Sequence, residues 1–354
     1  MKISIIILNY LKAKKTVKNI LSFLEQEVDF GFEIIVVDNS CDEKEKNIFL
    51  DFINNKLEKI FPNVKKFTEK KFLLHENSSS NLLTCAKIQK LPDDNYKNID
   101  QKIYSASIKK NNFKNHNHCS QLKKEGRATR APLFNKTKNL DKSQKNNQVN
   151  LKFIFNEKNT GYSKGNNLGV KNSQGKFLAI VNPDIYLEQK NVLQKILNFY
   201  QKNPDIGILG PKQIQYDSKK IEKTARAFPK LSTQIARRTW LKNIQGFRKK
   251  IALDEMKNLD YKKIQEVDWL QSSFIFLSKK LWDQVGGFNE KYFLFMADVE
   301  ICKKSWQLQK KVIFYPKVSV MADGIRCSRG GFFSFFYKQI LRHHVKDSLR
   351  YFFK

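Results

Sequence analysis

The chain has 354 residues, 41% of them hydrophobic, and a formal net charge of +32. Its length and apolar content allow one large α/β domain or two smaller ones, and they argue against fibrous and wholly disordered classes. The charge favours an anionic partner: nucleic acid, an anionic membrane surface or a phosphorylated ligand. Lys far exceeds Arg, and no pattern typical of a nucleic-acid-binding module is present, so nucleic acid is the weaker alternative.

Cysteine usage and apolar segments bear on the compartment. The five cysteines are odd in number and form no Cys-x-x-Cys pair, which favours free thiols in a reducing compartment. The apolar run at residues 3–8 is too short for a signal peptide, and no stretch reaches the ~18 apolar residues of a membrane-spanning helix. We therefore expect a cytoplasmic protein that contacts the inner face of the cell membrane peripherally, if at all.

Residues 1–60 alternate between strand and helix patterns. The apolar, β-branched runs at residues 3–8 and 32–37 predict strands that are buried on both faces. Each run is followed by apolar residues at helical spacing. This order predicts an α/β fold with a mostly parallel, doubly wound sheet and helices on both of its faces. We take residues 1–60 as the first part of a nucleotide-binding domain.

The remainder of the chain divides by composition. Residues 61–150 are rich in Lys and Asn without a clear period, which is typical of a basic insertion that is disordered or irregular. Residues 151–325 return to strand and helix patterns and are expected to complete the domain with its metal and acceptor sites. The tail, 326–354, predicts an amphipathic helix with Phe333, Phe336 and Ile340 on its apolar face. Apolar periodicity does not distinguish a membrane-surface helix from a core-packing one.

Short polar clusters follow three of the predicted strands, at residues 9–10, 38–40 and 182–184. Ligands of open parallel sheets bind outside the carboxyl ends of the strands, so these clusters are candidate ligand contacts. Pro183 restricts the backbone before Asp184 and would present its carboxylate stiffly. Carboxylate and diphosphate oxygens together suit Mg²⁺ or Mn²⁺. A turn or helix cap is the competing interpretation of each Asp. Walker-type and dinucleotide-binding glycine motifs are absent from the sequence.

These clusters, together with residues 159–167, 267–269, 286–288 and 298–300, resemble the family 2 glycosyltransferases. The likeness is greatest to the rhamnosyltransferase-like branch of bacterial surface polysaccharide synthesis, and it covers about residues 1–55 and 151–325 with the motifs in family order. The resemblance implies a GT-A fold. It also implies inverting, metal-assisted transfer from a nucleoside-diphosphate sugar, with dTDP-rhamnose as a candidate donor, to a hydroxyl of a lipid-linked or polysaccharide acceptor.

The resemblance also assigns roles to individual residues. Asp298 matches the catalytic base, and Asp184 matches the metal-binding acid, with Asp323 as a second metal ligand. The residues matched to donor binding are Asn9, Tyr10, Asp38, Asn39, Gly161, Lys164, Asn166 and Asn182. Those expected to contact the acceptor are Asp268, Trp269 and Glu300.

Two positions depart from the family pattern. Ala297 stands where the family commonly has Glu, and Met321 stands where it often has a metal-binding His. Methionine is a poor ligand for Mg²⁺ or Mn²⁺, so Asp323 would have to supply the replacement oxygen. A catalytically inactive scaffold on the same fold is therefore an alternative to the enzyme. Without the surrounding motif, Asp298 would be interpreted as the N-cap of the helix that follows it.

Overall fold

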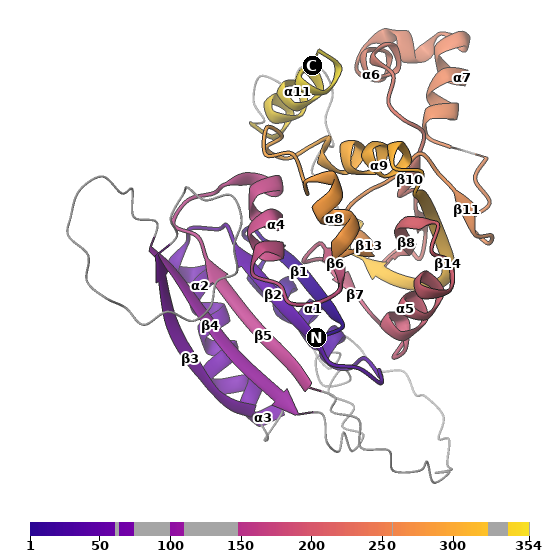
Figure 1. The fold of residues 1–354 in the computed structure, drawn as a ribbon. Coiled ribbons are helices and arrows are strands. Elements are labelled where there is room, and N and C mark those ends of the chain that lie inside the picture. Colours follow the sequence, from indigo (N-terminus) through magenta and orange to yellow (C-terminus); the bar gives the residue numbers. More distant parts are fainter. Residues whose placement is uncertain (61–63, 74–99, 110–147, 257, 325–338, 354) are drawn as a thin grey trace.

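The computed structural model describes residues 1–60, 64–73, 100–109, 148–256, 258–324 and 339–353. These residues form a mixed, 12-stranded sheet with helices packed around it (Figure 1). The strands follow the order β11-β14-β8-β13-β6-β1-β2-β5-β4-β3, with the short strands β7 and β9 paired to β14 and β8. The predicted α/β class is confirmed.

The centre of the sheet is parallel, as predicted. β1 (Ile3–Asn9) lies between β2 (Phe32–Asp38) and β6 (Phe177–Val181), and β2 pairs in parallel with β5 (Gln148–Phe155). Every residue of β2 is buried, because both faces of the sheet are covered by helices. Parallel pairing brings the carboxyl ends of these strands to one edge, where Asn9 lies opposite Asp38.

The flank beyond β6 is mixed. β13 (Phe274–Ser278) runs antiparallel to both β6 and β8 (Ile206–Gln215), while β14 (Lys311–Ala322) runs parallel to β8. The sheet as a whole is thus less parallel than the βαβα order of residues 1–60 indicated. The short strands of this half are β7 (Ile185–Tyr186), β9 (Ile221–Glu222), β10 (Ala225–Arg226), β11 (Gln265–Glu266) and β12 (Trp269–Leu270); β10 and β12 form a separate two-stranded sheet.

The segment 61–150, to which the sequence analysis assigned no element, contributes two strands in its described parts. β3 (Val64–Leu73) and β4 (Asp100–Lys109) form an antiparallel pair, and β4 pairs antiparallel with β5. In β4, Ile103 and Ile108 are buried beside the central sheet. β3 and β4 need few apolar residues because they add to the edge of a sheet whose core is already formed by the central strands.

Helices cover both faces of the sheet, and the strand residues alternate between two cores. Ile5 and Ile7 face one core, while Ile6 faces the other. The first core is covered by α1 (Ala13–Leu24), α2 (Glu43–Asp51), the π-helical turn η1 (Phe52–Lys56), α3 (Leu57–Ile60) and α5 (Val192–Lys202). The second is covered by α4 (Gly161–Lys171), α8 (Lys279–Val285) and α9 (Ala297–Gln307).

A group of three helices projects from the sheet in Figure 1. It comprises α6 (Leu231–Arg238), the 3₁₀ helix η3 (Trp240–Asn243) and α7 (Gln245–Asp254). The guanidinium of Arg237 in α6 binds the buried carboxylate of Asp254 in α7 and so holds the two helices together. Among the described residues, none of the helices is both long and apolar enough to span a bilayer.

The C-terminal helix α11 (Gln339–Phe352) packs on the chain that leads into α9. Asp347 is fully buried and accepts hydrogen bonds from the backbone N–H groups of Phe293, Leu294 and Phe295, at 3.1, 2.9 and 2.9 Å. Ile340 is 37% exposed. The helix therefore docks through a polar position, and the predicted apolar contacts Phe333 and Phe336 lie outside the described residues.

Candidate functional site

Asn9 and Asp38 form a buried polar pair at the carboxyl edge of the central strands. The Asn9 amide donates to Asp38 Oδ1 at 2.9 Å and to Ser40 Oγ at 3.0 Å, while Thr16 Oγ1 donates to Asn9 Oδ1. Burial raises the pKa of Asp38, although its hydrogen bonds from Ser40 and Asn9 act in the opposite direction. The described residues provide no hydrogen bond to Asp38 Oδ2, so this atom can accept one from a ligand. Tyr10, next in the chain, is 50% exposed.

Asn39 connects the same edge to the start of α4. Its Oδ1 accepts from the amide of Asn156, and its Nδ2 donates to the carbonyl oxygen of Gly161 at 3.0 Å. Both the oxygen and the nitrogen of the Asn39 amide therefore form hydrogen bonds within the protein. In this structure Asn39 holds the loop before α4, and its expected contact with the donor stays a prediction.

Gly161 fixes the position of that loop against the chain before α9. Its φ is +83°, and an added Cβ would lie 2.5 Å from the carbonyl oxygen of Phe293. The N–H of Tyr162 donates to that same oxygen at 2.6 Å. Glycine is required for both reasons, since only glycine combines a positive φ with so close a backbone approach. Asn166 is buried one turn along and donates to the carbonyl of Tyr162.

The other two predicted donor residues differ in their surroundings. Lys164 is the exposed residue in the otherwise largely buried start of α4, with its ammonium 4.0 Å from Glu290. Asn182 follows β6, and its backbone is held by Ser273 and by the amide of Asn19. Its side chain makes no hydrogen bond with the described residues, so it is available to a ligand at this edge.

Asp184 and Asp323 lie opposite each other where β7 meets β14. Ile185 pairs with Ala322 in this antiparallel contact, so the register places the two carboxylates at neighbouring positions one residue further on. The ammonium of Lys12 lies 2.6 Å from Asp184 Oδ2, and that of Lys15 lies 2.7 Å from Asp323 Oδ2. Both lysines stand at the start of α1, directly after β1.

This pair of carboxylates fits a hard divalent cation in ligand type. In proteins, Mg²⁺ or Mn²⁺ is usually held by one or two carboxylates together with the oxygens of a substrate phosphate. Met321 is buried on β14 beside Tyr186 and offers only a thioether, so Asp323 provides the carboxylate oxygens at this strand end. A bound cation would compete with Lys12 and Lys15 for these oxygens. The lysine side chains are 28% and 38% exposed and have room to turn toward a phosphate.

Asp298 is a half-buried carboxylate in the first turn of α9. Burial raises its pKa to about 6, against the effect of backbone hydrogen bonds from Ser272 and Val299. The N-cap of α9 is Met296, with φ of +69°, so Asp298 is not the cap that its sequence position suggested. A carboxyl group with this pKa is ionised near neutral pH and is a stronger base than an ordinary Asp.

Tyr162 links the two acidic positions. Its hydroxyl donates to Ser272 Oγ at 2.8 Å, and the N–H of Ser272 points to Asp298. Burial raises the pKa of Tyr162, and the negative charges of Asp298 and Asp184 raise it further. Both carboxylates therefore lie within electrostatic range of one phenol. Residues more than a hundred positions apart in sequence are thus brought to one region.

The three expected acceptor residues have internal partners. Asp268 accepts the N–H of Phe228 at 2.7 Å, and the indole of Trp269 donates to the carbonyl of Ala227 at 2.8 Å. Both tie β12 to the chain after β10. Glu300 is 5% exposed.

The surroundings of Glu300 give it a structural role instead of the expected acceptor contact. Its two oxygens accept from Tyr292 and Asn289, and Lys304 lies 3.4 Å away. Two residues along a helix correspond to a rotation of about 200°, so Glu300 and Asp298 point to different sides of α9. Glu300 stabilises the loop before the helix.

Four residues of this region were not identified from the sequence: Lys12, Lys15, Tyr162 and Ser272. Lys12 and Lys15 lie in a lysine-rich chain, where no local signal separates them from surface lysines. Their position directly after the first strand was the one available indication.

Residues 135–257, about a third of the chain, match the family model described as Glycosyl transferase family 2. No curated protein matches the sequence. The match supports a glycosyltransferase.

Several solved structures are similar in fold. The Staphylococcus aureus protein TarS, residues 1–349, has 14% identity and a TM-score of 0.44, covering 98% of this chain and 65% of that one. The mannosyltransferase PcManGT from Pyrobaculum calidifontis, in complex with GDP-Man and Mn²⁺, has 11% identity and a TM-score of 0.47, covering 99% and 64%. GalNAc-T7 with UDP, GalNAc and Mn²⁺ has 11% identity and a TM-score of 0.47, covering 91% and 44%. The chain spans less than two thirds of the length of each.

Proposed function

We propose that this chain transfers a sugar from a nucleoside-diphosphate sugar to an acceptor hydroxyl, with inversion at the anomeric carbon. The observation that carries the proposal is that the charges of Asp184 and Asp298 both raise the pKa of the Tyr162 phenol, which places the two carboxylates within electrostatic range of one side chain. One acid stands at the strand edge, where a diphosphate would lie, and the other has a pKa suited to a general base. The family 2 match supports the same reaction class.

Donor binding would use the carboxyl edge of the central strands. Asp38 Oδ2 accepts a hydrogen bond from the base, and the exposed ring of Tyr10 offers it an apolar face. The diphosphate lies toward Lys12 and Lys15, whose ammonium groups offset its charge. Asp184 and Asp323 would hold the divalent cation, which when bound neutralises charge on the departing diphosphate.

Asp298 performs the proton transfer. Its carboxylate removes the proton of the acceptor hydroxyl as that oxygen bonds to the anomeric carbon, and the bond from this carbon to the diphosphate oxygen breaks. The proton remains on Asp298, and the electron pair leaves with the nucleoside diphosphate. The Ser272 and Val299 N–H groups keep the carboxylate in place through the step.

The finer identity of the substrates is part of the proposal. We propose dTDP-rhamnose as the donor and a lipid-linked or polysaccharide acceptor, on the sequence resemblance to the rhamnosyltransferase-like branch. The indole of Trp306 in α9 donates to the carbonyl oxygen of Asp268, so the Asp268–Trp269 segment lies against the helix that carries Asp298 and would influence acceptor fit.

Donor binding and its dependence on Asp184 can be measured by thermal unfolding. A nucleoside-diphosphate sugar at about 100 times its Kd should stabilise the protein by about 2.7 kcal/mol, because it binds only the folded state. With Mn²⁺ present, Asp184→Asn should remove most of this gain. Asp217→Asn, at an exposed turn, is the matched control and should behave as the unsubstituted protein. Equal shifts in both variants would show that donor binding does not need Asp184 and would remove it from the proposed site.

A peripheral membrane contact would suit a lipid-linked acceptor, and the α6–η3–α7 group is the surface best suited to it. Trp240 and Leu253 are 71% and 69% exposed. The exposed cations of residues 230–254 are Lys230, Lys242, Arg248, Lys249 and Lys250. The one carboxylate in this stretch, Asp254, is buried against Arg237. Apolar and cationic side chains together are typical of a helix that lies on an anionic bilayer.

Vesicle binding separates this surface from the C-terminal helix. The double variant Trp240→Ser and Leu253→Ser should lower binding to anionic vesicles at least about tenfold. It removes two large apolar side chains that would be transferred from water to the bilayer on binding. Leu308→Ser, at a 44%-exposed apolar position after α9, should leave binding unchanged. A loss caused by Ile340→Ser but not by the double variant would place the contact on α11 instead. Sedimentation with phosphatidylserine vesicles provides the measurement.

A further inference from the structure

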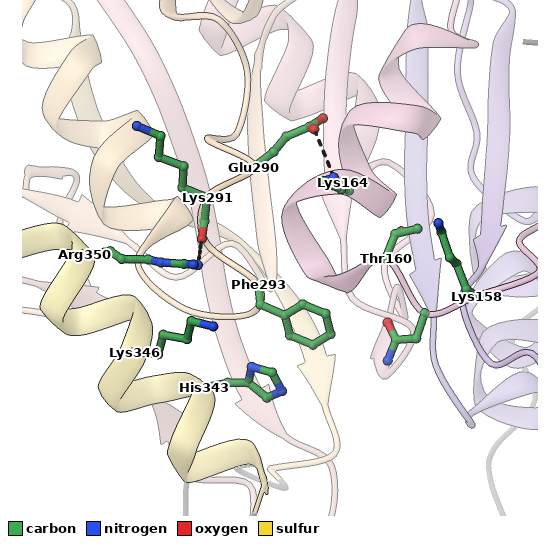
Figure 2. A pocket seen from close by; sticks show the side chains of 10 residues that line it. Lys158, Thr160, Lys164, Glu290, Lys291, Phe293, His343, Lys346 and Arg350 are labelled. Carbon is green, nitrogen blue, oxygen red and sulfur yellow. Dashed lines mark hydrogen bonds and ion pairs between the residues drawn. The ribbon is translucent and has the colours of Figure 1, made fainter. Parts of the chain in front are cut away.

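A cationic pocket of about 370 Å³ lies between the start of α4 and the helix α11 (Figure 2). Half of its ten lining residues are Lys or Arg, compared with 66 of 354 in the whole chain, and a single carboxylate, Glu290, is among them. The lining residues are Lys158, Asn159, Thr160, Lys164, Glu290, Lys291, Phe293, His343, Lys346 and Arg350. Lys and Arg are thus more frequent in the pocket lining than in the chain as a whole.

Most of this charge has no counterpart among the residues that the structure describes. Glu290 lies 4.0 Å from Lys164, and both side chains are about half exposed, so this ion pair is weak. Lys158, Lys291 and Lys346 form no ion pair with any described residue. In Figure 2 the ammonium of Lys346 extends into the space beside Phe293. Like charges around one concavity repel, and an anion bound between them relieves that repulsion.

The pocket is held open by contacts that do not depend on a ligand. The rings of Phe293 and His343 stack with centroids 4.2 Å apart. Arg350 donates to the carbonyl oxygen of Lys291, and Asp347 fixes α11 to the backbone of residues 293–295. On the opposite wall, Asn159 Oδ1 accepts the Gly161 N–H, which fixes the position of the Asn159 side chain. The site is therefore largely preformed.

We propose that this pocket binds a phosphate or diphosphate group of the acceptor substrate. The inference rests on the proposed sugar transfer. The pocket lies against Phe293, whose carbonyl binds the N–H of Tyr162 in the network that reaches Asp298. The donor diphosphate has its own cations, Lys12 and Lys15, at the strand edge. A second cluster of cations beside the chain that leads to the base fits an acceptor that carries phosphate.

Calorimetric titration with inorganic pyrophosphate tests the site. We expect Lys158→Glu combined with Lys346→Glu to weaken pyrophosphate binding at least about tenfold, because charge-assisted contacts are lost from both walls. Both lysines are exposed, so the fold should tolerate the change. The control is Lys202→Glu, at the exposed end of α5, which alters the net charge without touching the pocket. Equal weakening in the control would show a general charge effect and overturn the proposal.

Two further titrations identify the source of the phosphate and separate this inference from the proposed function. A soluble prenyl diphosphate that binds more tightly than pyrophosphate indicates a lipid-linked acceptor, and equal affinities indicate a phosphorylated glycan. Nucleoside-diphosphate binding should be unaffected by the pocket variants and lost in Asp184→Asn. If the pocket variants abolish nucleoside-diphosphate binding instead, the site belongs to the donor and the acceptor assignment is wrong. Loss of donor binding in every protein, the unsubstituted one included, would instead refute the proposed function.

Discussion

Replacing Asp298 with Asn should lower kcat by about 10²–10⁴-fold, the usual contribution of a well-placed general base. Asn has the same shape and keeps one of the two oxygens that accept from the N–H groups of Ser272 and Val299, so it retains one of these hydrogen bonds and the start of α9 should remain in place. Donor affinity should stay unchanged, since the residues proposed to bind the nucleotide are at the strand edge. Steady-state kinetics with a donor titration measures both quantities. A variant that retains full kcat would remove Asp298 from the mechanism.

The raised pKa of Asp298 adds a pH signature to this variant. The base must be ionised, so kcat of the unsubstituted enzyme should rise with pH through about 6 and then level off. Stability should change in the opposite direction. Between about pH 4 and 6 the unfolded chain loses this proton while the folded chain retains it, so the free energy of unfolding falls as pH rises. Above this window Asp298→Asn should be more stable than the parent by about 1–2 kcal/mol, after allowance for solvent screening. Chemical denaturation at pH 4 and pH 7.5 measures the difference.

The strand edge was predictable because its signals are local. The β-branched runs of β1 and β2 specify buried parallel strands, and parallel strands bring their carboxyl ends together. The adjacency of Asn9 and Asp38 follows from these two rules and is what the register shows. The pairing of Asp184 with Asp323 does not follow in this way. It depends on the two-residue strand β7, which is too short to produce a periodic pattern.

Contacts between distant segments account for what the sequence could not predict. Glu300 follows Asp298 by two residues, and only the positions of Tyr292 and Asn289 reveal that its carboxylate faces inward. Asp347 lies in a tail whose apolar spacing suggested a lipid or core contact through Ile340. Its partners are backbone N–H groups, which carry no sequence signature. The strands β3 and β4 were obscured for a different reason, since an edge hairpin rich in Lys needs few apolar residues.

Asp347 gives the second large expected effect, because it positions the chain that leads to Asp298, the proposed base. Its carboxylate binds three consecutive N–H groups immediately before Met296, whose positive φ turns the chain into α9. Removing the acceptor takes the partner from three half-buried donors at once. Hydrogen bonds to charged groups contribute about 1.5–3 kcal/mol each, so Asp347→Ala should release α11 or lower the free energy of unfolding by about 3 kcal/mol or more.

The kinetic consequence distinguishes positioning from simple destabilisation. At a temperature where Asp347→Ala remains folded, kcat should fall at least about tenfold while the KM for the donor stays constant, because the base moves and the strand edge does not. Asp347→Asn keeps one acceptor oxygen and should recover part of the loss. Leu349→Ser, at a 51%-exposed position of the same helix, is the matched control. If kcat per folded molecule is equal in all four proteins, α11 stabilises the fold without positioning Asp298. A selective fall in kcat would make this buried carboxylate part of the support for catalysis.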